Sequence, residues 1–146
     1  DLDNVMKFAI FDIITIGYPF CAFKIIAGLH LNSKILLVLG IIDLIINSLN
    51  LFLLFIKKKK LDTCLLAFLT RKFFKAPREH QRNWQEFGES LDVALSFILV
   101  AYFIGTGEIT ALESSQLMAW NWAVVFNVLG AGASRVIHSV SNIKRI

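Results

Sequence analysis

The chain has 146 residues, of which 56% are hydrophobic and 18% charged, and its formal net charge is +4. So large an apolar share leaves too little polar surface for a water-soluble globular enzyme. The positive charge does not point to nucleic acid, because the basic residues lie between apolar runs and no nucleic-acid motif accompanies them.

Four apolar stretches are each long enough to cross a bilayer as an α-helix. A hydrocarbon core of about 30 Å needs about 20 apolar residues, and a helix satisfies its own backbone hydrogen bonds. The predicted spans are residues 8–28, 35–56, 91–112 and 117–137. We therefore predict an all-α integral membrane protein, a single membrane domain over residues 1–146, whose four transmembrane helices form two antiparallel hairpins. Pro19 should kink the first span, because it cannot donate a backbone hydrogen bond.

Basic residues are distributed unevenly between the two sides of these spans. The connector over residues 57–90 and the C-terminal tail are rich in Lys and Arg, whereas the opposite loops hold only Lys34. Because short cytoplasmic loops carry an excess of Lys and Arg, we predict that both termini are cytoplasmic. The predicted location is a bacterial inner (plasma) membrane, with an organellar inner membrane as the alternative.

The connector has the pattern of a helix that lies on the membrane surface. Leu65, Phe68 and Phe73 recur at helical spacing among polar residues, and Pro77 should end this helix before a second helical stretch leads into the third span. We expect its basic side chains to contact anionic lipid headgroups or a partner protein. These residues are Lys57, Lys58, Lys59, Lys60, Arg71, Lys72 and Lys75.

Polar residues inside the first two spans are predicted to form a network. Asp43, Asn47 and Asn50 are spaced i, i+4 and i+7 and so share one helix face. Counted from the turn near residue 31, Asp12 lies level with Asn50, and the long Lys24 side chain can reach Asp43. Such a network either holds helices together or forms an ion or proton path, and the first role is the preferred interpretation.

The last two spans yield further expectations. Asp92 and Arg135 lie at similar distances from the turn between them, which predicts an ion pair at the cytoplasmic boundary. Small residues in the fourth span, Gly130, Gly132 and Ser134, predict close helix packing. Cys21 and Cys64 are expected near opposite membrane faces, which argues against a disulfide.

No catalytic signature occurs in the sequence, and we predict no enzyme activity, no cofactor and no metal site. The leading hypothesis is a non-catalytic accessory, scaffold or assembly subunit of a larger membrane complex. The alternative is a small oligomeric ion or proton channel, or a transporter, that uses the polar residues of the first two spans. Predicted partners are a bilayer with anionic headgroups and other membrane subunits, and nucleic acid is not among them.

Overall fold

The structure is a computed structural model that describes residues 2–56, 61, 64–75 and 77–144. Within these ranges every element is helical. In chain order the elements are α1 (Leu2–Asp12), the π-helical turn η1 (Ile13–Gly17), α2 (Tyr18–His30), α3 (Lys34–Phe55), α4 (Leu65–Phe73), α5 (Arg78–Gly105), the 3₁₀ turn η2 (Glu108–Ala111) and α6 (Ser114–Ile143).

Within the described residues, four helices are long and apolar enough to cross a bilayer, as the sequence predicts. They cover Val5–His30, Lys34–Phe55, Arg78–Gly105 and Ser114–Ile143. The predicted end of the third span at residue 112 is wrong, because the helix stops at Gly105. Gly107 then adopts a left-handed backbone conformation with φ of 78°, which glycine tolerates, and η2 follows.

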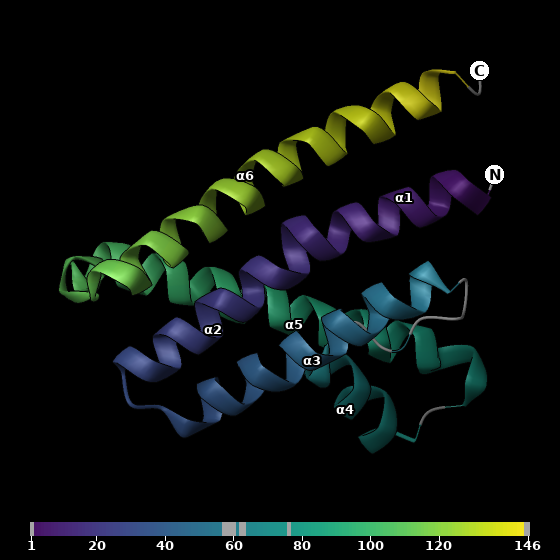
Figure 1. Cartoon of the computed structure of the whole chain (residues 1–146). Helices are drawn as coiled ribbons and strands as arrows, with labels where there is room; N and C mark the ends of the chain where they lie inside the picture. The colour runs from purple at the N-terminus through teal and green to yellow at the C-terminus, as the bar shows by residue number, and fades with distance from the viewer. Residues whose placement is uncertain (1, 57–60, 62–63, 76, 145–146) are drawn as a thin grey trace.

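The first span occupies the centre of the bundle. Its α2 segment packs against α3, α5 and α6, and η1 also contacts α3 and α6. Both ends of the described chain lie at one end of the bundle, which we call the terminal end (Figure 1). The opposite end holds residues 31–33 and 106–113, and we call it the turn end.

An irregular turn in the first span forms the contact with α6. Pro19 has no backbone N–H, so the carbonyl of Thr15, four residues earlier, loses its usual helical donor. The Asn127 side-chain amide donates to this carbonyl at 3.1 Å. Gly130, one turn along α6, lies so close that a Cβ there would sit 2.2 Å from the Thr15 Cβ. The Asn127 amide of α6 therefore replaces the hydrogen-bond donor that Pro19 lacks.

The small residues of α6 consequently differ in role. Gly130 is buried against Thr15, whereas Gly132 points into open space and Ser134 is half-buried. Gly130 therefore meets the predicted close packing within this chain. Gly132 lies on a different face of α6 and meets no described residue, so its predicted packing against another helix stays a prediction.

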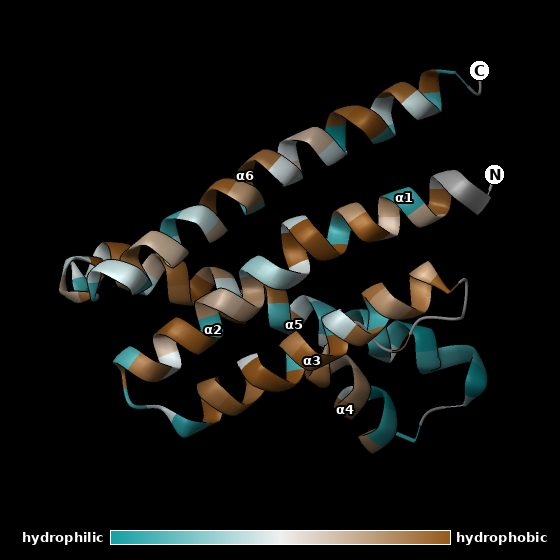
Figure 2. Cartoon of the chain, viewed as in Figure 1, coloured by the Kyte–Doolittle hydropathy of each residue, from teal (hydrophilic) through white to brown (hydrophobic). Residues whose placement is uncertain are grey.

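A cluster of aromatic side chains closes the bundle toward the turn end. Phe23, Phe103 and Trp120 are at most 1% exposed, and their ring centroids lie 4.9 Å (Phe23 to Trp120) and 4.7 Å (Phe103 to Trp120) apart. Nearby, His30 Nε2 lies 2.7 Å from Glu108 Oε2 and joins α2 to the loop after α5. Outward-facing apolar residues cover much of α3 and α6, whereas the beginning of α5 is hydrophilic (Figure 2).

Candidate ion-binding site

The described residues that follow α3 lie along the polar face of that helix, and we call residues 61 and 64–65 the returning segment. The Leu61 N–H donates to Asn50 Oδ1, and the Leu65 N–H donates to Asp43 Oδ1, each at 2.7 Å. Helix α4 therefore begins beside Asp43, which lies 12 residues, or about 18 Å, before the end of α3. Backbone groups away from water need partners, and the polar face of α3 supplies them to this returning segment.

Asn47 lies between these two contacts on the same face. Its amide donates to the Asp43 carbonyl at 2.8 Å and lies 3.5 Å from Cys21 Sγ. Its side-chain oxygen occupies the space that a Cβ at Gly17 would take, at 2.2 Å. The expectation that Asp43, Asn47 and Asn50 face protein is confirmed, because all three are at most 6% exposed.

Lys24 joins three helices at the level where α4 begins. Its ammonium group donates to Asp43 Oδ2, as predicted, and to Asp92 Oδ1 at 2.5 Å. The three side chains are 1%, 3% and 10% exposed, respectively. One buried cation thus lies between two carboxylates, and the N-terminus of α4 adds a partial positive charge beside Asp43. We call Lys24, Asp43 and Asp92 the charged cluster.

The predicted pair between Asp92 and Arg135 is wrong. Asp92 accepts a hydrogen bond from Lys24, and the Arg135 side chain is exposed. Counting from a turn compares depths along two helices but not the directions that their faces point. Helix α6 packs along α2 and η1, so Arg135 does not face the side of α5 that carries Asp92.

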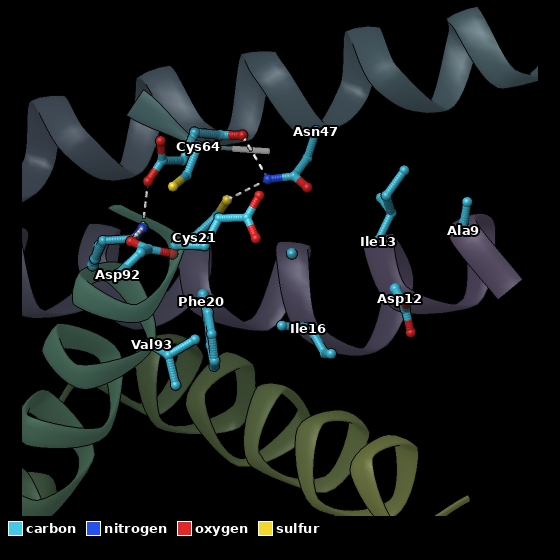
Figure 3. A pocket seen from close by; sticks show the side chains of 14 residues that line it. Ala9, Asp12, Ile13, Ile16, Phe20, Cys21, Asn47, Cys64, Asp92 and Val93 are labelled. Atoms are coloured by element: carbon cyan, nitrogen blue, oxygen red, sulfur yellow. Dashed lines mark hydrogen bonds and ion pairs between the residues drawn. The ribbon is translucent and has the colours of Figure 1, made fainter. Parts of the chain in front are cut away.

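A cavity of about 300 Å³ adjoins the charged cluster. Asp92 lies at one end of the view in Figure 3, and Asp12 and Ala9 lie at the other. Asp12 is exposed, so the cavity reaches the surface in the half of the first span nearer the terminal end. The lining residues are Ala9, Asp12, Ile13, Ile16, Gly17, Phe20, Cys21, Lys24, Asp43, Asn47, Cys64, Glu89, Asp92 and Val93.

The two cysteines line this same cavity, so the expectation that they lie toward opposite faces is wrong. The cause is the returning segment, which carries Cys64 back to the level of Asp43. Both thiols are free and buried. Cys64 caps α4 by accepting the Ala67 N–H at 3.4 Å, and burial raises the pKa of its thiol to about 12.

The basic connector residues are placed only in part. Lys57, Lys58, Lys59 and Lys60 lie outside the described residues. Arg71 is half-buried on α4, and Lys72 and Lys75 are exposed at and just beyond its end. None of the three lines the cavity.

Sequence reasoning identified Lys24 and Asp43 as a pair but missed Asp92, Glu89 and Cys64 as neighbours of that pair. No spacing signal links the start of α4 to the middle of α3, because their contact depends on the path of the segment between them. Within the described ranges, no group of three or more His, Cys, Asp or Glu side chains could hold a metal ion. Comparisons of the chain with protein-family models, curated proteins and solved structures found no match.

Proposed function

We propose that this chain is a small multi-pass membrane transport protein that binds and releases a proton at the charged cluster. The observation that carries the proposal is the cavity that leads from the exposed Asp12 to a buried ammonium between two carboxylates. Ionisable side chains are costly in a bilayer and are typical of proton and ion pathways. Four carboxylates, Asp12, Asp43, Glu89 and Asp92, and the ammonium of Lys24 are among the lining groups, which favours a positively charged ligand.

A proton fits this arrangement better than a metal cation. The Lys24 ammonium already occupies the position between the two carboxylates, so a metal ion would have to displace it. A proton needs only one carboxylate oxygen. Asp43 accepts hydrogen bonds from both Lys24 and the Leu65 N–H, so protonation of Asp92 sacrifices fewer hydrogen bonds among the described contacts. The protonated Asp92 leaves Lys24 paired with Asp43, and loss of the proton restores the cluster.

Access to the cluster is proposed from the terminal end. The start of α5 carries Glu79, Arg82, Glu86 and Glu89 on the terminal side of Asp92, whereas the aromatic cluster closes the turn side. Polar side chains favour water on the first side. Packed rings exclude water on the second, so transport requires that these rings separate transiently. The distribution of Lys and Arg supports the terminal end as the cytoplasmic one.

Proton flux into liposomes tests this function. The purified chain is reconstituted with a pH-sensitive dye inside, and an imposed pH gradient is followed with a potassium ionophore present to clamp the membrane potential. We expect flux above that of empty liposomes, and we expect Asp92→Asn to abolish most of it. Glu79→Gln is the matched control, because Glu79 is exposed and does not line the cavity. Wild-type flux equal to that of empty liposomes, or full flux in Asp92→Asn, would overturn the proposal.

A second candidate is the accessory or assembly subunit predicted from the sequence. The observation in its favour is the outward face of α6, where Ala131, Gly132 and Ala133 are exposed and a Cβ at Gly132 would meet open space. Small residues on an outer face let a neighbouring helix approach closely. Native mass measurement after gentle extraction separates the two candidates. A stoichiometric heteromeric complex, together with no flux from the isolated chain, would favour the subunit role.

A further inference from the structure

We propose that the junction of α4 and α5 binds the headgroup of an anionic phospholipid. The proposed site, which we call the basic elbow, consists of Phe68, Lys72, Phe73, Lys75 and Arg78. It shares no residue with the cavity, so this inference does not depend on proton transport.

The position of the basic elbow along the bundle matches a membrane boundary. Lys24 holds Asp43 and Asp92 at one level. From that level α3 continues for 12 residues to Phe55, and α5 extends back for 14 residues to Arg78. At about 1.5 Å per residue these distances are roughly 18 Å and 21 Å. Arg78 therefore lies near the level where the apolar helix α3 ends, at the depth of lipid headgroups if α3 spans the bilayer. Helix α4 runs from the level of Asp43 toward that end, since its Thr70 donates to the Trp84 carbonyl of α5.

Helix α4 leaves two of its aromatic side chains uncovered by the described part of the chain. Its small residues contact α5, where a Cβ at Gly88 would lie 2.6 Å from the Ala67 Cα. Phe68 and Phe73, in contrast, are 37% and 76% exposed. Exposed aromatic side chains next to cations are typical of a helix end at the membrane interface, where α4 ends. Acyl chains can cover these rings without any partner protein.

All three cations of the basic elbow, Lys72, Lys75 and Arg78, are exposed and so accessible to a phosphate group. Lys72 Nζ lies 5.4 Å from the centre of the Phe68 ring. Lys75 is exposed just after α4, and Arg78 is exposed at the start of α5. The nearby acids have other partners, since Glu86 accepts from Arg82 at 3.0 Å and Glu79 lies 3.7 Å from His80. Each basic side chain at an anionic membrane surface strengthens binding roughly fivefold.

Fluorescence quenching by brominated lipid tests the site. Trp84 stacks on Phe74, next to the basic elbow, with ring centroids 4.0 Å apart. The substitutions Trp120→Phe and Trp122→Phe leave Trp84 as the only tryptophan of the three in the sequence. This variant is placed in nanodiscs that contain a small, equal fraction of brominated lipid, either phosphatidylglycerol or phosphatidylcholine. We expect the anionic lipid to quench Trp84 several-fold more strongly.

The variant K72Q/K75Q/R78Q in the same background should remove this preference, and high salt should weaken it. The matched control K7Q/K34Q removes two basic residues away from the elbow and should keep the preference. Native mass spectrometry gives an independent measurement: retained phosphatidylglycerol should be lost from the triple variant and kept in the control. Equal quenching by the two lipids, or an unchanged preference in the triple variant, would overturn the inference.

Discussion

Lys24 makes the interaction on which the middle of this bundle depends. Its ammonium is buried and serves two carboxylates that come from different helices. In a medium of low dielectric, removal of one member of such a group leaves charges that neither water nor a partner compensates. The resulting loss in the free energy of unfolding is larger than for the exposed ion pair of Arg82 and Glu86, because solvent screens that pair.

We therefore expect Lys24→Met to destabilise the protein strongly, by about 3–5 kcal/mol, because Asp43 and Asp92 are left facing each other. The exposed Lys34 gives the matched control Lys34→Met, which should have little effect. Thermal unfolding in mild detergent, followed by circular dichroism, measures both. Equal melting temperatures for the two variants would contradict a stabilising role for Lys24.

Cys64 should react slowly with maleimide at neutral pH. Its raised pKa, about 12, means that the thiolate is far scarcer at pH 7 than in an ordinary cysteine, and the rate should keep rising as pH increases toward that value. The measurement is the rate of alkylation of a Cys21→Ser variant in detergent. The comparison protein carries Lys144→Cys in a background without native cysteines. Equal rates would show that Cys64 is exposed and ionises normally.

At the scale of elements, the sequence predicts regular helices well and irregular contacts poorly. The polar face of α3 could be assigned to the protein interior from the spacing of Asp43, Asn47 and Asn50 alone. Its main partners could not, because two of them are backbone N–H groups of Leu61 and Leu65, and a backbone group leaves no mark in a sequence. Side-chain periodicity therefore identifies a polar face but not what it binds.

The same limit applies to the contact between α6 and the first span. Pro19 predicts a free carbonyl at Thr15, but nothing in the sequence indicates that Asn127 is the donor that uses it. The similar depths of Asp92 and Arg135 along their helices likewise do not predict a contact, because two helices at one level can present different faces to each other. The position of Cys64 could not be predicted either, because it depends on how the chain runs between α3 and α4 rather than on the spacing of side chains.

Gly130 and Gly132 allow a matched test of the α6 contact. Gly130→Ala should destabilise the fold by about 1–3 kcal/mol, because its Cβ would overlap Thr15. Gly132→Ala should be neutral or slightly stabilising, because its Cβ enters open space and alanine favours a helix by about 1 kcal/mol. Chemical denaturation in mixed micelles measures the difference. An equal loss of stability in both variants would show that α6 does not pack here as described.

At the scale of the whole molecule, an even number of spans is expected to place the two termini on one side of a membrane. The basic connector and tail predict that this side is the cytoplasm. The turn end, with Lys34, should then face outward. The prediction concerns the complete topology and can be tested with two exposed positions, Lys34 and Asn142, one near each end of the bundle.

Single cysteines at these positions report the orientation. In a Cys21→Ser/Cys64→Ser background, Lys34→Cys should react with a membrane-impermeant maleimide in intact cells. Asn142→Cys should react only after permeabilisation. Serine at position 64 can still cap α4, which limits the disturbance. The reverse labelling pattern would invert the topology, and labelling of both positions in intact cells would contradict a membrane-spanning bundle.

The return of the chain along α3 also constrains the order in which the protein can be completed during synthesis. A ribosome makes the chain from its N-terminus, so Asp43 is translated before Leu65 and Asp92 exist. When Asp43 has just been translated, Lys24 is the only other member of the charged cluster that has already been made. We therefore expect the Lys24–Asp43 pair to form first, as the second span enters the membrane, and the contacts with Leu65 and Asp92 to form later. Lys24→Met should therefore impair insertion of the second span, whereas Asp92→Asn, which leaves the Lys24–Asp43 pair in place, should not.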